Sequence, residues 1–298
     1  MWGGLARAAA IQGQIEQSGR TRGPNGINVW VSAGVSHLSV KNAPNFPNDS
    51  GTPFGGTIGA DYHTPSGVVI GAAVFAGDAV QNFSTGGNFE QVDEALSLYA
   101  AYQTGPLWGN AVASYDLLQD HVSRQVPLGI FTDQNKGDSS GHDLALALRG
   151  GWDFHVGAFT FGPVAGLVLQ QVRLNGFRET GTTGMTALSF GAQTRNSAVS
   201  QLGVRGSMEI GDWRPFAELA WNHELADRNR TVTASLTSIA APAYSAAAIP
   251  AASDWASVSA GTSYRINART DLRAAVSAMF VNPQMNSYGA GVWLNVGF

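Results

Sequence analysis

The sequence contains no cysteine, few charged residues and no long apolar run, and each absence excludes a class of protein. Without cysteine, the 298-residue chain can form neither a disulfide scaffold nor a thiolate metal site. Charged residues make up 13% of the chain and its net charge is −4, so its electrostatics do not favour nucleic acid as a partner. The longest nearly apolar run, Gly67–Gly77, is too short for the ~20 residues of a membrane-spanning helix.

What the sequence does contain is abundant glycine and regularly spaced apolar residues. It has 37 glycines, and 44% of its residues are hydrophobic. A chain of this length can bury a large core or close a sizeable barrel. The spacing of the apolar residues therefore has to distinguish a soluble fold from a membrane fold.

The clearest spacing lies at the C-terminus, in residues 288–298, where apolar residues recur at every second position. A period of two places one set of side chains on one face of a strand and the other set on the opposite face. The apolar face consists of Tyr288, Ala290, Val292, Leu294, Val296 and Phe298. The other face is small or polar apart from Trp293. This pattern favours a strand of an outer-membrane barrel over a strand of a soluble sandwich.

Earlier segments repeat the alternation, so that the chain contains about twelve predicted strands. They lie within residues 28–35, 57–63, 68–74, 93–103, 110–117, 143–154, 161–169, 201–209, 218–225, 257–264 and 273–280. An even number is what bacterial single-chain barrels require. Aromatic residues near the strand ends, such as Tyr62, Tyr102 and Trp152, are candidates for the girdles at the two membrane surfaces.

The connections between these strands alternate in length. Short turns are predicted at Thr64–Gly67, Thr104–Pro106, His155–Gly157, Gly211-Asp212, Asn267–Arg269 and Asn282-Pro283. Long polar loops are predicted near Lys41–Pro53, Gly77–Asn88, His121–Ser140, Asn175–Arg195 and Arg228–Ala252. Short turns on one side of a membrane and long loops on the other are typical of outer-membrane proteins. A soluble all-β fold would show neither this alternation nor charges along one face of nearly every strand.

One helix is predicted, from Trp2 to about Ser18, because this segment is rich in alanine and glutamine. Its length of roughly 25 Å matches the height of a barrel's apolar band. Its small and polar side chains suit a narrow wet lumen, although a helix packed on a sheet or lying at the membrane interface stays open. Glycine and proline in Gly19–Gly26 then break the helix. The predicted domains are residues 1–25, a linker helix threading the barrel, and residues 26–298, the barrel itself.

The predicted fold is therefore all-β: a twelve-stranded antiparallel transmembrane β-barrel with an N-terminal α-helix inside the lumen. An outer-membrane protein has to be exported, yet Met1–Arg7 lacks the basic-then-apolar layout of a secretory signal. We therefore expect this chain to be the C-terminal part of a longer precursor.

The chain resembles the translocator (β) domain of a type V autotransporter along roughly its whole length. The resemblance is carried by the helix before the first strand, by Trp213–Glu224 and by the closing strand Tyr288–Phe298. Three stretches, Gln103–Asn110, Arg124–Gly129 and Gln193–Val199, resemble more narrowly those autotransporters whose passenger is a GDSL-type esterase.

The resemblance implies a monomeric barrel in the outer membrane of a Gram-negative cell, which exports an N-terminal passenger and anchors it at the surface. It implies outer-membrane lipid, periplasmic chaperones, the barrel-assembly machinery and the barrel's own passenger as partners, and no cofactor. It also implies that the terminal strand is the signal read during assembly, with Tyr288, Val292, Leu294, Val296 and Phe298 as the signal residues.

Charged residues on the polar faces of the strands are candidates for contacts in the lumen. Lipid cannot satisfy such groups, so the lumen or the helix must. Arg7 and Glu16 of the helix are expected to pair with them, although solvation of a wet interior would explain the same charges. The candidate strand residues are Asp61, Asp93, Asp116, Asp153, Glu209, Glu218, Glu224, Arg149, Arg205 and Arg273. In either case the charges favour a plugged pore over an open channel.

No catalytic or metal site is predicted in this chain. Gly137–Ser140 is superficially similar to the GDS block of the esterases, but we expect it in a hydrophilic loop without an oxyanion block nearby. His142-Asp143 beside Ser139 or Ser140 is better explained as part of the same loop. The six histidines show no ligand spacing. The alternative functions are an outer-membrane channel of the porin type and a barrel-embedded hydrolase.

Overall fold

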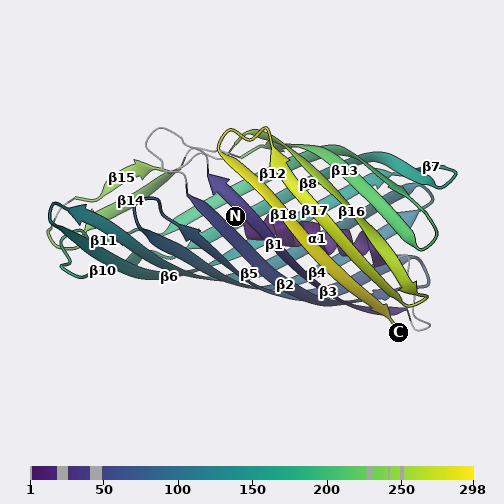
Figure 1. The fold of residues 1–298 in the computed structure, drawn as a ribbon, viewed down its shortest axis with the longest axis horizontal. Coiled ribbons are helices and arrows are strands. Elements are labelled where there is room, and N and C mark those ends of the chain that lie inside the picture. The colour runs from purple at the N-terminus through teal and green to yellow at the C-terminus, as the bar shows by residue number, and fades with distance from the viewer. Residues whose placement is uncertain (1, 19–25, 41–48, 227–229, 241, 249–251) are drawn as a thin grey trace.

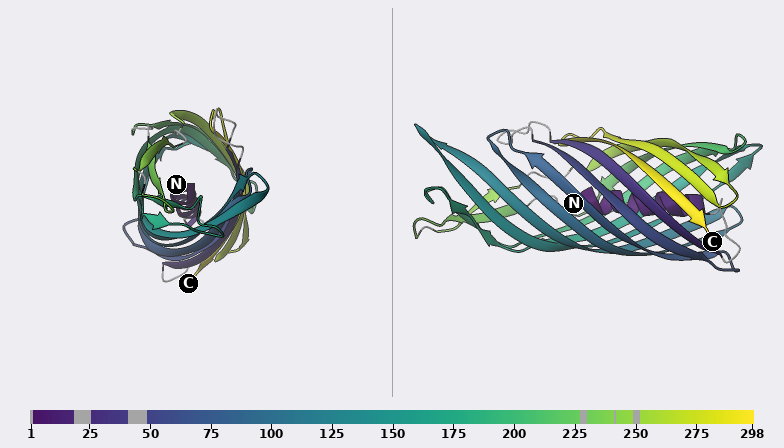
Figure 2. Two further views of the ribbon diagram at one scale, coloured as in Figure 1. Left: turned by 90° about the vertical axis from the view of Figure 1, so that its left-hand side faces the viewer. Right: turned by 60° about the horizontal axis from the view of Figure 1, so that its bottom comes forward.

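The computed structural model describes residues 2–18, 26–40, 49–226, 230–240, 242–248 and 252–298. Twelve antiparallel strands close into a barrel around one helix, which confirms the predicted fold class (Figures 1 and 2). The helix is α1 (Trp2–Ser18). The barrel strands are β1 (Ile27–Val40), β2 (Ser50–His63), β3 (Val68–Asn82), β4 (Gly87–Thr104), β5 (Leu107–Leu128), β6 (Phe131–Trp152), β8 (Phe159–Leu174), β12 (Gln193–Met208), β13 (Trp213–Glu224), β16 (Asp254–Asn267), β17 (Thr270–Phe280) and β18 (Met285–Gly297). None of the helices in these ranges is both long and apolar enough to cross a membrane.

The barrel is closed by the pairing of its first strand with its last. β1 pairs with β18 from Asn28↔Gly297 to Val40↔Met285, and every other barrel strand pairs with its neighbours along the chain. A closed sheet leaves no edge with unpaired backbone groups, which is what the hydrocarbon layer demands. Side chains alternate as the period of two predicts: Val29 and Val31 face outward, whereas Asn28 and Trp30 are buried in the lumen.

The short turns gather at one end of the barrel, where the C-terminus also lies (Figure 1). Gly105 and Gly211 adopt φ of 56° and 60° in two of these turns, with nothing within 4 Å of an added Cβ. Their backbone conformation, and not a shortage of space, therefore favours glycine. The predicted turn at Asn282-Pro283 is also short, but it joins β17 to β18 at the opposite end, among the longer connections.

Two predicted loops are largely strand, because the sheet continues beyond the alternating segments. β5 continues to Leu128 and β6 begins at Phe131. The two strands form a long hairpin through residues that were predicted to be a loop. β3 and β4 likewise approach each other at Asn82 and Gly87. Both faces of these extensions carry polar residues. The alternation of apolar and polar residues therefore ends there, although the backbone hydrogen bonds between the strands continue.

The remaining short strands belong to the connections. β9 (Phe177–Arg178), β11 (Leu188–Phe190), β14 (Thr231–Leu236) and β15 (Tyr244–Ala247) form a separate four-stranded sheet at the long-loop end. β10 (Thr180–Gly181) pairs with β6, and β7 (Phe154–Val156) pairs with β8. The predicted long loops around Asn175–Arg195 and Arg228–Ala252 therefore together hold all four strands of this small sheet. Residues 41–48, 227–229, 241 and 249–251 lie outside the described ranges.

The helix lies inside the barrel, along its axis (Figure 2). Ile11 and Ile15 of α1 pack in one buried cluster with Trp30 of β1, Tyr99 of β4 and Val112 of β5. This placement excludes a helix at the membrane interface. The contact between helix and wall is also more apolar than the helix composition suggests, because apolar side chains fill part of the space between them.

Candidate functional site

The candidate site is the set of contacts that hold α1 inside the lumen. Near the middle of the barrel, Arg7 enters a cluster of three carboxylates from adjacent strands. Its Nη1 lies 3.3 Å from Asp93 Oδ2 of β4 and its Nη2 lies 3.9 Å from Asp143 Oδ2 of β6, and Nη2 also pairs with Asp116 of β5. Arg7 is 3% exposed and Asp116 is 0% exposed, so water does not screen these charges.

A second ionic cluster surrounds Glu16, nearer the short-turn end. Glu16 Oε1 lies 3.2 Å from a guanidinium nitrogen of Arg149 and 3.2 Å from one of Arg205. Arg149 also pairs with Glu218 of β13, and Arg205 Nη2 lies 2.9 Å from Asp153 Oδ2. The nine-residue spacing of Arg7 and Glu16 separates the two clusters by roughly 14 Å along the helix.

Trp108 supports the Glu16 cluster on the wall of the barrel. The Arg205 guanidinium lies 3.7 Å from the centroid of its ring, and the indole Nε1 donates a 3.2 Å hydrogen bond to Asp153. A stacked arginine gains a cation–π attraction, and the N–H groups of its guanidinium stay free to bond carboxylates. The pattern of charged residues alone does not identify Trp108 as a lumen residue. The alternation along β5, which places Trp108 on the inward face, does identify it.

Between the two clusters the wall contacts the helix backbone directly. Arg273 of β17 donates to the carbonyl of Gly13, and its guanidinium carbon lies 4.1 Å from the ring centroid of Phe216 and 5.1 Å from that of Trp293. A Cβ at Gly13 would lie 3.0 Å from Arg273 Nη1, so glycine permits this close approach. Gln12 Nε2 also donates a 3.1 Å hydrogen bond to Asn110 Oδ1 of β5.

Three predicted residues lie apart from the helix contacts. Asp61 accepts hydrogen bonds from Asn28 Nδ2 at 3.0 Å and from the Tyr99 hydroxyl at 3.1 Å. Glu224 accepts from the Ser197 hydroxyl at 2.5 Å, towards the long-loop end. Glu209 follows the last residue of β12 and is exposed, with Oε1 3.3 Å from Arg214 Nε. The alternation along β12 would place Glu209 on the inward face, but it lies past the end of the strand and outside the lumen. Its prediction as a lumen residue is therefore corrected.

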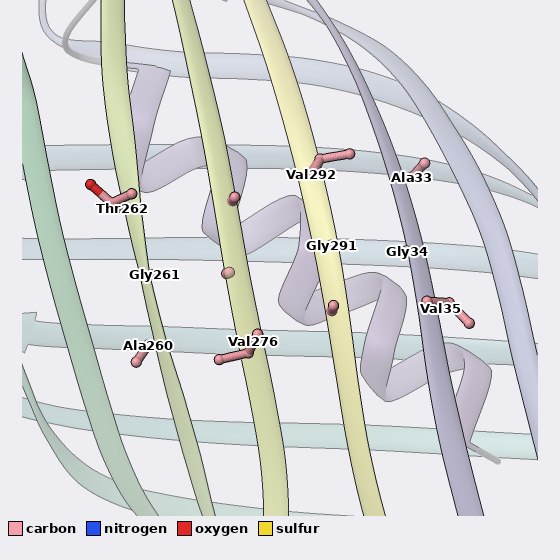
Figure 3. A pocket seen from close by; sticks show the side chains of 12 residues that line it. Ala33, Gly34, Val35, Ala260, Gly261, Thr262, Val276, Gly291 and Val292 are labelled. Atoms are coloured by element: carbon pink, nitrogen blue, oxygen red, sulfur yellow. The ribbon is translucent and has the colours of Figure 1, made fainter.

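The closing strand presents its apolar face to the outside of the barrel. Tyr288, Val292, Leu294 and Phe298 are exposed in the isolated chain, and the Phe298 amide donates to the Ile27 carbonyl at 2.8 Å. Small residues of β1 and β16–β18, among them Ala33, Ala260 and Gly291, form a shallow apolar depression beside the seam (Figure 3). The outward set continues around the barrel and suits contact with lipid.

The hydrolase alternative finds only weak support in the geometry. Gly137–Ser140 lies in β6 and not in a loop, and the Ser139 hydroxyl donates to the Asn175 carbonyl at 2.8 Å. Ser200 and His223 are register neighbours across β12 and β13, but the Ser200 hydroxyl bonds the His223 carbonyl at 3.4 Å. Within the described ranges, no group of three His, Cys, Asp or Glu residues could hold a metal.

A strand-built transmembrane barrel closed around an internal helix defines the class: an outer-membrane protein with a filled lumen. The autotransporter beta-domain family matches residues 29–277, and the chain belongs to this family. It is accordingly a translocator domain of the Gram-negative outer membrane.

Solved structures show the same architecture. The translocator domain of autotransporter NalP from Neisseria meningitidis is similar with a TM-score of 0.77 at 16% identity, over 99% of this chain and 97% of that one. The beta domain of the Bordetella autotransporter BrkA has a TM-score of 0.63 at 17% identity, over 92% and 100%. The Pseudomonas putida toluene transporter TodX is less similar, with a TM-score of 0.54 at 10% identity, over 92% and 91%.

Curated relatives are longer proteins. Lipase 1 of Photorhabdus luminescens is 26% identical over 233 residues, which are 72% of this chain and 36% of the relative. Esterase EstA of Pseudomonas aeruginosa is 26% identical over 216 residues, which are 70% of this chain and 33% of the relative. The chain thus spans about a third of the length of these relatives.

Proposed function

We propose that the barrel exports a passenger that precedes α1 and afterwards holds it at the cell surface, with residues 1–25 as the linker and residues 26–298 as the barrel. The observation that carries this proposal is the direction of the helix. Glu16 contacts the wall near the short-turn end and Arg7 nearer the middle, so the N-terminus points towards the long loops. A chain that preceded the helix would leave through that end.

The passenger we propose is an ester hydrolase. Lipase 1 and EstA support this assignment, because they match over this segment and extend well beyond it. In this assignment the barrel contributes no catalytic residue of its own. Its partners are the passenger, outer-membrane lipid, periplasmic chaperones and the barrel-assembly machinery, and it acts as a monomer without a cofactor.

Export by this chain can be tested by fusing an exported, epitope-tagged passenger ahead of Met1 in a Gram-negative host. The tag should become sensitive to protease added to intact cells, while the barrel stays in the outer-membrane fraction. A matched chain that lacks β17 and β18 cannot close the barrel and serves as the control. A barrel that inserts normally while the tag stays protected would contradict the export function.

A channel is the second candidate, because TodX shares the barrel architecture. The filled lumen argues against an open pore, since α1 is joined to the wall by ion pairs, by the cation–π contact of Arg7 with Phe75, and by apolar contacts at successive heights. A solute pathway would need the helix to leave the lumen.

A further inference from the structure

The outer surface of the barrel changes from apolar to polar at one row of β6 and β8. Below this row, towards the short turns, the outward residues are Leu144, Leu146, Leu148 and Trp152 on β6 and Phe161, Ala165, Leu167 and Leu169 on β8. The register pairs Leu144 with Gln171 and His142 with Arg173. The pair His142–Arg173 is thus the first row in which both outward side chains are polar. Lipid headgroups lie at this height, because the apolar residues below must meet acyl chains.

This row places a guanidinium beside an imidazole on the outer surface. His142 and Arg173 are direct neighbours across the two strands, and Tyr115 of β5 stacks on His142 at 6.0 Å between ring centroids. Asp143, the next residue along β6, points the other way and accepts a 2.5 Å hydrogen bond from Gln170 in the buried lumen. Among the residues that the structure describes, no carboxylate pairs with the Arg173 guanidinium.

The other histidines on the outer surface near this height have different surroundings. His223 of β13 lies 2.9 Å from Asp254, and His121, further up β5, lies 2.7 Å from Asp138. His37 stands beside Tyr288 at 5.1 Å, without an arginine opposite it. Only the row on β6 and β8, within the described ranges, therefore combines a guanidinium with an imidazole and leaves both available to an anion.

The backbones of β6 and β8 are held close together beside this pair. A Cβ at Gly141 would collide with the carbonyl of Arg173, so glycine allows β6 and β8 to approach closely beside the pair. Just above, Asn175 bonds Ser140 twice, with its amide on the carbonyl at 2.9 Å and its Nδ2 on the hydroxyl at 3.0 Å. The Ser139 hydroxyl adds a 2.8 Å bond to the Asn175 carbonyl. These contacts order the backbone beneath the pair, so an anion can bind there without a rearrangement of the two strands.

We propose that Arg173 and His142, with Tyr115 stacked on the imidazole, bind the phosphate of a lipid in the outer leaflet, with the acyl chains of that lipid lying over Leu144 and Leu169. The planar guanidinium can donate two parallel hydrogen bonds to phosphate oxygens, and the imidazole can donate a third. The ligand is a membrane lipid and not free phosphate, because the apolar surface begins directly below His142 and Arg173. The proposal depends on the membrane location of the barrel, and not on the passenger.

The test uses the full chain folded in dodecylmaltoside micelles, with bound lipids counted by native mass spectrometry. The probes are dihexanoyl phosphatidic acid, dihexanoyl phosphatidylcholine and inorganic phosphate. Arg173→Gln should weaken the binding of phosphatidic acid by about tenfold, as expected for the loss of one charge-assisted contact, and His142→Gln by less. Arg173→Lys should retain part of the affinity for phosphatidic acid, because lysine keeps the charge but cannot donate two parallel hydrogen bonds to one phosphate.

Lys136→Gln is the matched control, because Lys136 faces outward on the same strand, three outward positions above His142. It should leave the affinity unchanged. Equal losses of affinity for phosphatidic acid in Lys136→Gln and Arg173→Gln would overturn the proposal in favour of a non-specific electrostatic attraction. Competition by inorganic phosphate at the same concentration as the lipid would likewise overturn it in favour of a simple anion site. Heat-modifiable migration of every variant on gels shows that the barrel itself is folded, so a loss of lipid is not a loss of structure.

Discussion

At the residue scale, Arg7 pairs with three carboxylates, Asp93, Asp116 and Asp143. Replacing it with methionine would keep most of the side-chain volume but remove the guanidinium that compensates these buried negative charges. Breaking a buried ion pair in this way costs about 3–5 kcal/mol. We expect Arg7→Met to loosen the helix and raise the ion conductance of the chain in planar bilayers.

Arg269→Met is the control for this substitution, because Arg269 lies exposed in the turn between β16 and β17. Its conductance should equal that of the unchanged chain. Adding Asp116→Asn to Arg7→Met should restore part of the low conductance, since it removes one of the unpaired charges. A conductance that does not respond to Arg7→Met would mean that the apolar contacts of Ile11 and Ile15 hold the helix without the ion pairs.

A substitution at Phe298 can distinguish the stability of the barrel from its recognition during assembly. The Phe298 side chain faces outward at the short-turn end of β18. A lysine on the lipid face costs only ~0–1 kcal/mol near the membrane interface. We therefore expect Phe298→Lys to leave the β content of the refolded chain unchanged. Its insertion into the outer membrane of cells should nevertheless fall sharply, if the terminal residue is part of an assembly signal. Leu272→Lys, also outward at this end, is the control, and equal insertion of the two variants would contradict the signal.

At the element scale, α1 fills the lumen along ~25 Å of the barrel axis. A chain that begins at Gly26 should therefore conduct ions much better than the full chain in planar bilayers. The barrel should still form, because all twelve strands and the β1–β18 closure remain. Adding the helix as a separate peptide should lower the conductance again. Equal conductance of the two chains would mean that the long-loop end closes the pore by itself.

The strands that line the lumen also explain why the ion pairs form where they do. Asp93, Asp116 and Asp143 come from β4, β5 and β6, and the last two are direct register partners. Arg149, Arg205 and Glu218 come from β6, β12 and β13, lower in the barrel. The helix thus meets an acidic wall at Arg7 and a mainly basic wall at Glu16, and the two clusters set its height and its direction.

At the scale of the whole molecule, a closed barrel of this kind unfolds only when its strands separate. We expect the refolded chain to migrate as a heat-modifiable monomer on gels and to show little or no hydrolysis of short-chain p-nitrophenyl esters. Ser139→Ala, Ser140→Ala and Ser200→Ala should leave that background rate unchanged. Ester turnover that disappears in any one of these variants would contradict a non-catalytic barrel.

Much of this fold follows from local patterns in the chain. The alternation in Tyr288–Phe298 identifies the face of β18 that meets lipid, and the same period assigns Asn28, Trp30 and Asp61 to the lumen. The extensions of β5 and β6 could not be found in this way, because polar residues on both faces leave no period to detect. The same lack of period hid the small sheet of β9, β11, β14 and β15.

The sequence by itself determined the alternation, the strand number and the opposite charges of Arg7 and Glu16, because these depend only on the order of residues along the chain. Only the tertiary structure decided which charges meet. Asp93 and Asp116 contact the helix whereas Asp61 and Glu224 do not, although all four face inward. The physical reason is geometric: strand tilt and stagger, fixed when β1 pairs with β18, set the height of every inward side chain along the axis.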